Sequence, residues 1–187
     1  MVFGGKKKDN VSVLSDMANK QKRYEALVKA YHGDIFRYAY WLVHDRSVAE
    51  DIVQETFLRA WKSLDSLNEQ AKAKSWLITI LRRENARRFE RKQFNLVDID
   101  DHQVVDDQAV STEASMEQQL IQRQIMKLAP EYREPLLLQV VGGFSGEEIS
   151  NILDLNKNTV MTRLFRARNQ LKDNLESKDS AKGQYNG

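Results

Sequence analysis

A short stretch in the C-terminal third of the chain carries side chains suited to nucleic-acid recognition. Residues 157–168 read KNTVMTRLFRAR. Lysine and arginine neutralise phosphates, while asparagine, threonine and arginine reach base edges in the major groove. Phe165 favours binding, because an aromatic ring exposed between arginines gains little in water. The residues expected to contact DNA are Lys157, Asn158, Thr159, Thr162, Arg163, Phe165 and Arg166.

The apolar residues of the same stretch predict the helix that holds these side chains. They recur at steps of three and four, which is typical of a helix with one buried side. These residues are Val160, Leu164, Ala167 and Leu171. Asn156 can cap this helix, and Ser145 and Glu148 have the spacing of a capping box that opens a shorter helix before it. Residues 143–171 therefore predict a helix-turn-helix, although the pattern alone also fits a plain helical hairpin with a solvated basic face.

A second stretch with an unusual row of side chains along one side of a predicted helix is AEDIVQETFLRAW, residues 49–61. One side of this predicted helix is apolar and faces a core. Ser47 and Glu50 have capping-box spacing at its start. The other side carries, at helical spacing, Asp51, Gln54, Glu55 and Leu58. A face meant only for water has no need of a leucine between carboxylates, so we expect it to contact a partner, with a solvated row as the alternative.

A third row is basic and lies on RRENARRFERK, residues 82–92. Its six basic residues outnumber its two glutamates by four. Arg83, Arg87 and Arg91 fall on one helical stripe, and Arg88 flanks it. A stripe of this kind suits a phosphate backbone.

Composition limits other kinds of chemistry. The chain has no cysteine, which excludes thiolate metal sites, and its three histidines are scattered. No grouping of nucleophile, base and orienting side chain stands out, so we expect no catalytic residue, metal, cofactor or small-molecule substrate. No apolar run approaches the roughly 20 residues that span a membrane. The first residues lack the apolar segment of a signal peptide, so we expect a cytoplasmic protein without membrane insertion.

The 187 residues predict an all-α fold of two small domains. Two prolines and eight glycines leave long helical patterns, and alternating β-branched runs are scarce. We expect a flexible lead-in, a helical domain, an acidic linker, a helix-turn-helix domain and a tail, over residues 1–19, 20–95, 96–115, 116–176 and 177–187. The linker prediction depends on six acids without a compensating cation. They are Asp98, Asp100, Asp101, Asp106, Asp107 and Glu113.

Two of these stretches together resemble a known family. AEDIVQETFLRAW is similar to the core-polymerase-binding helix of the extracytoplasmic-function (group four) sigma factors of bacterial RNA polymerase. LAPEYREPLLLQVVGGFSGEEISNIL, followed by TVMTRLFRAR, is similar to their domain for the −35 promoter element. The similarity covers roughly residues 24–91 and 117–175, in the order of the family. Met161 stands where the family often has a basic residue, and Asp154 replaces a glycine frequent in the turn.

The resemblance implies an alternative-sigma transcription initiation factor. The row of Asp51, Gln54, Glu55 and Leu58 would bind core RNA polymerase, and the row of residues 157–166 would contact the −35 element. The third helix and the loop before it would engage the −10 element and assist promoter melting, through Asn68, Lys72, Lys74, Arg83, Arg87, Arg88 and Arg91. The implied partners are core RNA polymerase, promoter DNA and an anti-sigma factor.

Two interpretations from other classes stay open at this point. A helix-turn-helix regulator that binds DNA alone would explain residues 143–171, but it leaves the row on residues 49–61 and the basic third helix unexplained. A helical adaptor without DNA contacts would show no salt-dependent affinity for DNA, whereas phosphate contacts require one.

Overall fold

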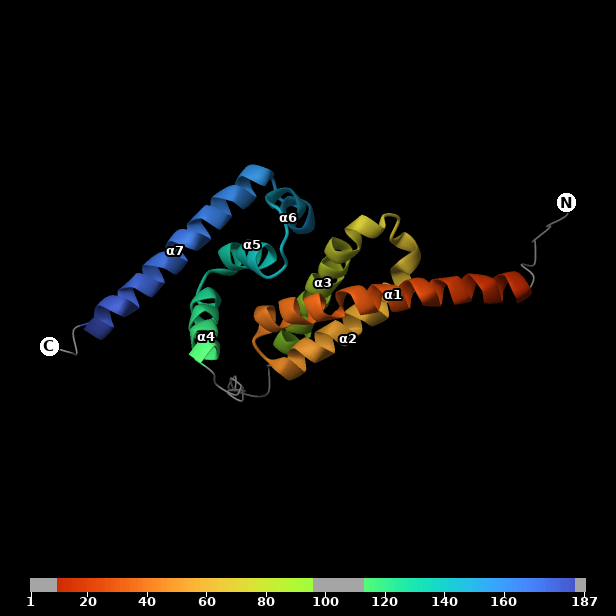
Figure 1. Ribbon diagram of the computed structural model, residues 1–187, viewed down its shortest axis with the longest axis horizontal. Coiled ribbons are helices and arrows are strands. Elements are labelled where there is room, and N and C mark those ends of the chain that lie inside the picture. Colours follow the sequence, from red (N-terminus) through yellow and green to blue (C-terminus); the bar gives the residue numbers. More distant parts are fainter. Residues whose placement is uncertain (1–9, 96–112, 184–187) are drawn as a thin grey trace.

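The protein is helical in every regular element that its computed structural model describes, over residues 10–95 and 113–183. The first group is α1 (Asn10–Val43), α2 (Arg46–Ser63) and α3 (Ala73–Asn95), with the short 3-10 helices η1 (Leu64–Ser66) and η2 (Gln70–Lys72) between α2 and α3. The second group is α4 (Glu113–Met126), α5 (Pro130–Val140), α6 (Gly146–Leu153) and α7 (Lys157–Gly183). The two groups lie beside each other in Figure 1, with the start of α1 and the end of α7 at opposite ends. The predicted all-α fold with two helical domains is confirmed, and residues 96–112 of the predicted linker lie outside the described residues.

The N-terminal domain is built from the apolar stripes of three helices. α2 buries Ala49, Ile52, Val53, Thr56, Phe57 and Ala60. Ile35 and Tyr38 of α1 and Leu77 of α3 are fully buried in the same core. The Tyr24 hydroxyl donates to the carbonyl oxygen of Phe57 at 3.1 Å, which fixes α1 against α2. Because this stripe of α2 faces inward, the row that begins at Asp51 faces outward.

The C-terminal domain packs α5 and α6 against α7. Leu136, Leu137 and Leu138 of α5 are buried, as are Val160, Leu164 and Ala167 of α7. A Cβ atom at Gly142 would lie 2.6 Å from the carbonyl oxygen of Leu138 and 2.7 Å from the Phe144 ring. Only glycine therefore allows the chain to turn after α5 while Phe144 enters the core.

Two helix starts test the predicted caps. The capping box of α6 is confirmed, because Ser145 and Glu148 exchange hydrogen bonds in both directions. The predicted box at Ser47 is wrong. Asp45 is the N-cap of α2, and its carboxylate accepts from the backbone N–H of Val48 at 2.9 Å. The left-handed conformation of His44, with φ of 59°, turns the chain early enough for Asp45 to take this place.

The outer helices extend further than the apolar pattern predicts. α1 begins at Asn10, ahead of the expected start near Lys20, and α7 continues to Gly183, past the expected end at 176. α4 begins at Glu113, inside the stretch expected as a linker. Residues 10–19 contain no glycine or proline that would stop a helix. Met17, near the end of this stretch, is 58% exposed.

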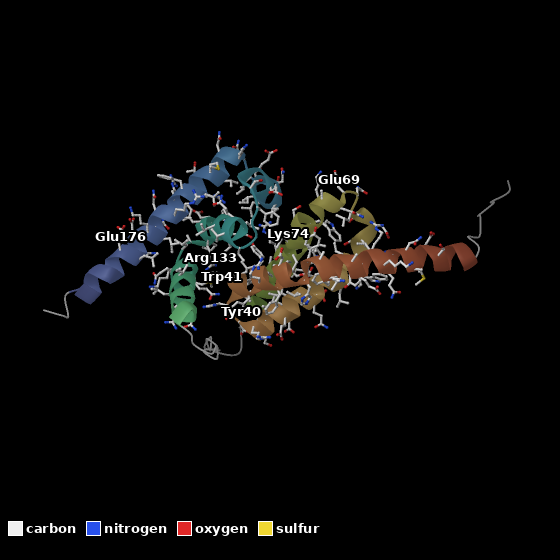
Figure 2. The ribbon with its side chains drawn as sticks, viewed as in Figure 1. Tyr40, Trp41, Glu69, Lys74, Arg133 and Glu176 are labelled. Atoms are coloured by element: carbon white, nitrogen blue, oxygen red, sulfur yellow. The ribbon has the colours of Figure 1, made fainter. Side chains whose placement is uncertain are left out.

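The two domains contact each other through α1 with α5 and α3 with α6. Arg82 of α3 pairs with Glu134 of α5, and its Nη1 donates to the carbonyl oxygen of Ile152 at 2.7 Å. Lys74 lies over the Phe144 ring, 5.6 Å from its centroid. Figure 2 shows Lys74 where α3 approaches the C-terminal helices. Nothing in the sequence pattern predicted this contact.

Candidate functional surfaces

The first candidate surface is the outward side of α7. Asn156 caps the helix, since its side-chain oxygen accepts from the backbone N–H of Asn158 at 2.7 Å. The buried side of α7 turns the predicted DNA-contact row toward solvent. Lys157, Asn158, Thr162, Phe165 and Arg166 are exposed, whereas Thr159 and Arg163 are half-buried. The structure therefore leaves five of the seven predicted residues of α7 open to solvent.

Some polar groups on this side of α7 already have partners within the chain. The Thr162 hydroxyl donates to the carbonyl oxygen of Asn158 at 2.9 Å. Arg166 Nη1 donates to the Tyr132 hydroxyl at 3.4 Å, a long bond that leaves its other N–H groups available. Lys157 lies 3.8 Å from Glu147, with both side chains mostly exposed. These weak contacts hold the side chains in place without covering them.

The turn between α6 and α7 sets the position of the outward side of α7. Asp154 adopts the left-handed conformation with φ of 52°, at the place where glycine is the usual residue. At the other end of α6, the Ser145 backbone N–H donates to Glu148 at 2.8 Å. This hydrogen bond, joined by one from the Ser145 hydroxyl, lowers the pKa of the Glu148 carboxyl. Both ends of α6 are thus fixed by local hydrogen bonds and turn geometry.

The second candidate surface is the basic stripe of α3. Arg83 and Arg91 are exposed and Arg88 is half-buried. Arg87 is exposed but donates to Glu84 at 3.0 Å. Glu84 is 8% exposed and also lies 2.7 Å from Arg59 Nε. The sequence pattern missed this buried carboxylate, because a glutamate in a basic run looks like an ordinary surface residue.

The loop before α3 contributes fewer open side chains than expected. Asn68 is exposed, and Lys72 pairs with its neighbour Glu69 at 2.7 Å. Lys74 pairs with Asp34 of α1 at 2.8 Å and is only 27% exposed. The hydrogen bond from Lys74 lowers the pKa of the Asp34 carboxyl. In this structure the Lys74 ammonium group therefore pairs with Asp34 of the same domain and is not open to DNA.

The third candidate surface combines the row on α2 with a groove beside it. Leu58 is 49% exposed, and Asp51 and Gln54 are exposed. Glu55 is half-buried and lies 3.1 Å from Arg59. The groove has a volume of about 580 Å³ and is lined by Gln54, Leu58, the ion pair of Arg46 and Glu50, and apolar or aromatic residues of both α1 and α2. Those residues are Tyr24, Val28, His32, Phe36, Val53 and Phe57.

Sequence reasoning missed the α1 side of this groove, because its residues look like ordinary core positions in a helical stripe. His32 stacks on the Phe57 ring at 5.7 Å between centroids. The row and the groove form a concave, partly apolar face with acids at its rim. Such a face fits a protein partner with an apolar centre and basic surroundings.

Two further kinds of site were sought among the described residues. No group of three His, Cys, Asp or Glu side chains there could hold a metal ion. No helix in these ranges combines the length and apolar character needed to cross a membrane.

Comparison with protein families now identifies the chain. Residues 27–94 match the model of Sigma-70 region 2, and residues 118–171 match that of Sigma-70, region 4. The chain is 32% identical over 151 residues to the ECF RNA polymerase sigma factor SigL of Mycobacterium tuberculosis, with 76% of this chain and 85% of SigL covered. The chain belongs to the ECF sigma factors. It is also 29% identical over 172 residues to SigW of Bacillus subtilis, with 83% and 90% covered.

Solved structures agree with this membership. The sigma factor RpoE, in complex with the anti-sigma factor NepR from Bartonella quintana, superposes with a TM-score of 0.65 at 26% identity, covering 84% of this chain and 97% of RpoE. CnrH, in complex with the cytosolic domain of CnrY, has a TM-score of 0.64 at 23% identity, covers 84% of this chain and 90% of CnrH, and shows the shared fold.

The family settles the general activity of the protein. As an ECF sigma factor it serves RNA polymerase in promoter recognition, binds core polymerase and DNA, and is not an enzyme. A stand-alone helix-turn-helix regulator does not explain the region 2 match over residues 27–94, and a helical adaptor does not explain the region 4 match.

Proposed function

We propose that this ECF sigma factor reads the −35 element with α7, engages the −10 element with α3 and the η2 loop, and docks on core polymerase through the α2 row. The observation that carries this assignment is the two-sided character of α7. Val160, Leu164 and Ala167 anchor one side in the domain, while cationic, amide and hydroxyl groups lie open on the other. A helix held in this way enters a major groove with its polar side forward.

The open cations of α3 support the −10 assignment. Arg83 and Arg91 can meet phosphates without losing a partner among the described residues, and Asn68 lies open in the preceding loop. Arg87 and Lys74 already pair with Glu84 and Asp34, so phosphate would have to share or replace these carboxylates. Cations that hold an opened strand assist promoter melting by stabilising its backbone.

The row of Asp51, Gln54, Glu55 and Leu58 on α2 suits docking on core polymerase. Leu58 supplies an apolar anchor beside a groove, and Asp51 supplies negative charge at the rim. Leu58→Asp should therefore weaken core binding at least tenfold, because a buried carboxylate would lack a partner in the interface. Asp51→Ala combined with Gln54→Ala and Glu55→Ala should weaken it less, since exposed charges contribute little individually.

The experiment measures core-polymerase affinity and promoter-specific transcription with purified full-length variants. Val140→Asp is the matched control, because Val140 is 59% exposed but lies on α5 in the other domain. Its core affinity should equal that of the unmodified chain. If Leu58→Asp and the triple variant bind core polymerase normally, the proposed docking face is wrong.

The proposed regulation follows from the relatives. RpoE forms a complex with the anti-sigma factor NepR, and we extend this kind of partner to the present chain, acting in the cytoplasm. An anti-sigma protein would hold the factor inactive by covering the polymerase-binding or DNA-binding faces. Adding such a protein before core polymerase should abolish promoter-specific transcription, while adding it after holoenzyme has formed should do so more slowly.

A further inference from the structure

Two apolar side chains stand open on the recognition side of α7. Met161 is 50% exposed and Phe165 is 63% exposed. They lie four residues apart, so their side chains are neighbours on consecutive turns of one helix face. Val160 and Leu164 already fill the core behind them. The pair therefore contributes little to packing of the isolated domain.

Met161 is positioned by the neighbouring helix. A Cβ atom at Gly146, in the first turn of α6, would lie 3.2 Å from Met161 Sδ. The missing side chain of Gly146 leaves room for the thioether against α6, and half of Met161 remains open to solvent. The thioether is thus held at the edge of the helix-turn-helix.

The surroundings of this pair favour DNA over a protein partner. Lys157 and Asn158 in the first turn of α7, and Arg166 next to Phe165 in the chain, are also exposed. Two apolar side chains among cations are too small a patch for the centre of a protein interface, where lysine is depleted. In a major groove, by contrast, the apolar feature within reach is the C5-methyl group of thymine.

We propose that Met161 and Phe165 form an apolar pair that contacts thymine methyl groups in the −35 element, so that this sigma factor prefers T·A pairs at those positions. The proposal deepens the function proposed above and depends on α7 entering the −35 major groove. Met161 carries the specific prediction, since an arginine at its place would favour guanine through O6 and N7.

The first test removes the methyl group from the DNA and leaves the protein unchanged. Holoenzyme is used to select binding sequences from a promoter library randomised at the −35 element. In the selected duplex, each thymine is then replaced by deoxyuridine, which lacks only the C5-methyl group. We expect the Kd to rise about fourfold at one or two positions, as loss of one buried methyl implies. A selected duplex with equal affinity for thymine and deoxyuridine at every position would overturn the proposal.

The second test links the methyl group to the side chain. Met161→Ala should bind the thymine and deoxyuridine duplexes equally at one position, and Met161→Arg should select G·C there. Val140→Ala, an exposed apolar change outside α7, should retain the full methyl dependence. Met161→Ala could instead raise the Kd of both duplexes by the same factor and keep the difference between thymine and deoxyuridine, or it could weaken only core-polymerase binding. Either result would mean that the side chain has another role, and the proposal fails. A library without any −35 preference would instead refute the proposed placement of α7.

Discussion

Glu84 connects the two functional faces of the N-terminal domain through one buried carboxylate. It lies 2.7 Å from Arg59 and accepts from Arg87 at 3.0 Å, and Arg59 also lies 3.1 Å from Glu55. Glu55 belongs to the α2 row proposed to bind core polymerase, and Arg87 belongs to the basic stripe of α3. A carboxylate removed from water is costly unless cations or hydrogen-bond donors surround it, so Glu84 depends on Arg59 and Arg87. The two faces therefore share one electrostatic support.

Replacing Glu84 with glutamine should destabilise the N-terminal domain. The neutral amide keeps the shape but weakens two charge-assisted contacts, so the free energy of unfolding should fall by about 1–3 kcal/mol. Urea unfolding followed by tryptophan fluorescence reports this domain, because Trp41, Trp61 and Trp76 all belong to it. Glu69→Gln, at an exposed pair with Lys72, is the control and should cost less than about 1 kcal/mol. Equal losses for the two variants would contradict the supporting role of Glu84.

Substitutions on α7 should separate base recognition from phosphate binding. Arg166→Ala should relax the preference at one −35 position, with a loss of about 1–3 kcal/mol for the preferred base pair. Lys157→Ala should weaken binding to all sequences alike and flatten its salt dependence. Holoenzyme affinity for a panel of −35 variants at several salt concentrations measures both effects. The assignment fails if the lysine change alters base preference and the arginine change does not.

Helix ends show what element-level patterns can and cannot predict. The α6 capping box follows from two residues at fixed spacing, and the structure contains it. Spacing does not predict the cap of α2 in the same way. Ser47 has the spacing of a capping box, but the left-handed His44 turns the chain earlier, and Asp45 becomes the N-cap. Apolar stripes locate packed helices well. They cannot locate the start of α1, which continues beyond the residues that pack.

The α6 cap should make the stability of the C-terminal domain depend on pH. The hydrogen bond from Ser145 lowers the pKa of Glu148 below its ordinary 4.5, so its contribution is complete above that value and is lost as the pH falls through the lower folded pKa. Glu148→Ala should cost about 0.5–2 kcal/mol at neutral pH, as other capping losses do. Thermal unfolding by circular dichroism at about pH 7 and pH 3 checks this. Glu147→Ala, one residue away, should cost less at neutral pH, and a Glu148→Ala deficit that persists undiminished in acid would contradict the prediction.

At the scale of the whole molecule, sequence patterns predicted the two helical domains, and they suggested three rows of contact residues. They did not predict which of those side chains pair within the protein. Lys74 and Arg87 looked like open cations, and the structure pairs them with Asp34 and Glu84. Arg82 looked like another member of the basic run, yet it joins the domains. Periodicity identifies which side of a helix is apolar. It contains no information on partners that lie tens of residues away in the chain.

The contact between the domains conflicts with simultaneous binding of both promoter elements. The −10 and −35 elements are about 25 base pairs apart, which is about 85 Å along B-DNA at 3.4 Å per base pair. In the structure α3 touches α6 directly, and Arg82 bridges to Glu134 and to the carbonyl oxygen of Ile152. If α3 and α7 engage the two elements as proposed, the contact has to open when the factor occupies an unbent promoter. Opening exposes the polar groups that Arg82 now satisfies, and polymerase and DNA have to supply the compensating interactions.

Reversing the charge at Arg82 should open the free protein. Since the chain has no cysteine, labels can be attached to Cys introduced by Lys29→Cys and Asn169→Cys, at exposed positions in the two domains. Arg82→Glu should lengthen the distance between the labels, because it replaces attraction to Glu134 with repulsion. Adding Glu134→Arg should shorten the distance again, although the bond to Ile152 stays lost. Arg83→Glu, the exposed neighbour, should leave the distance unchanged.

Measuring the same label pair in holoenzyme bound to promoter completes the test. There the unmodified chain and Arg82→Glu should give the same long distance, because DNA spacing has already separated the domains. A free Arg82→Glu protein with the label distance of the unmodified chain would show that this contact does not hold the domains together. A short distance on the promoter would show that the contact survives DNA binding, and the two elements would then have to be brought together by bending, at a cost of several kcal/mol.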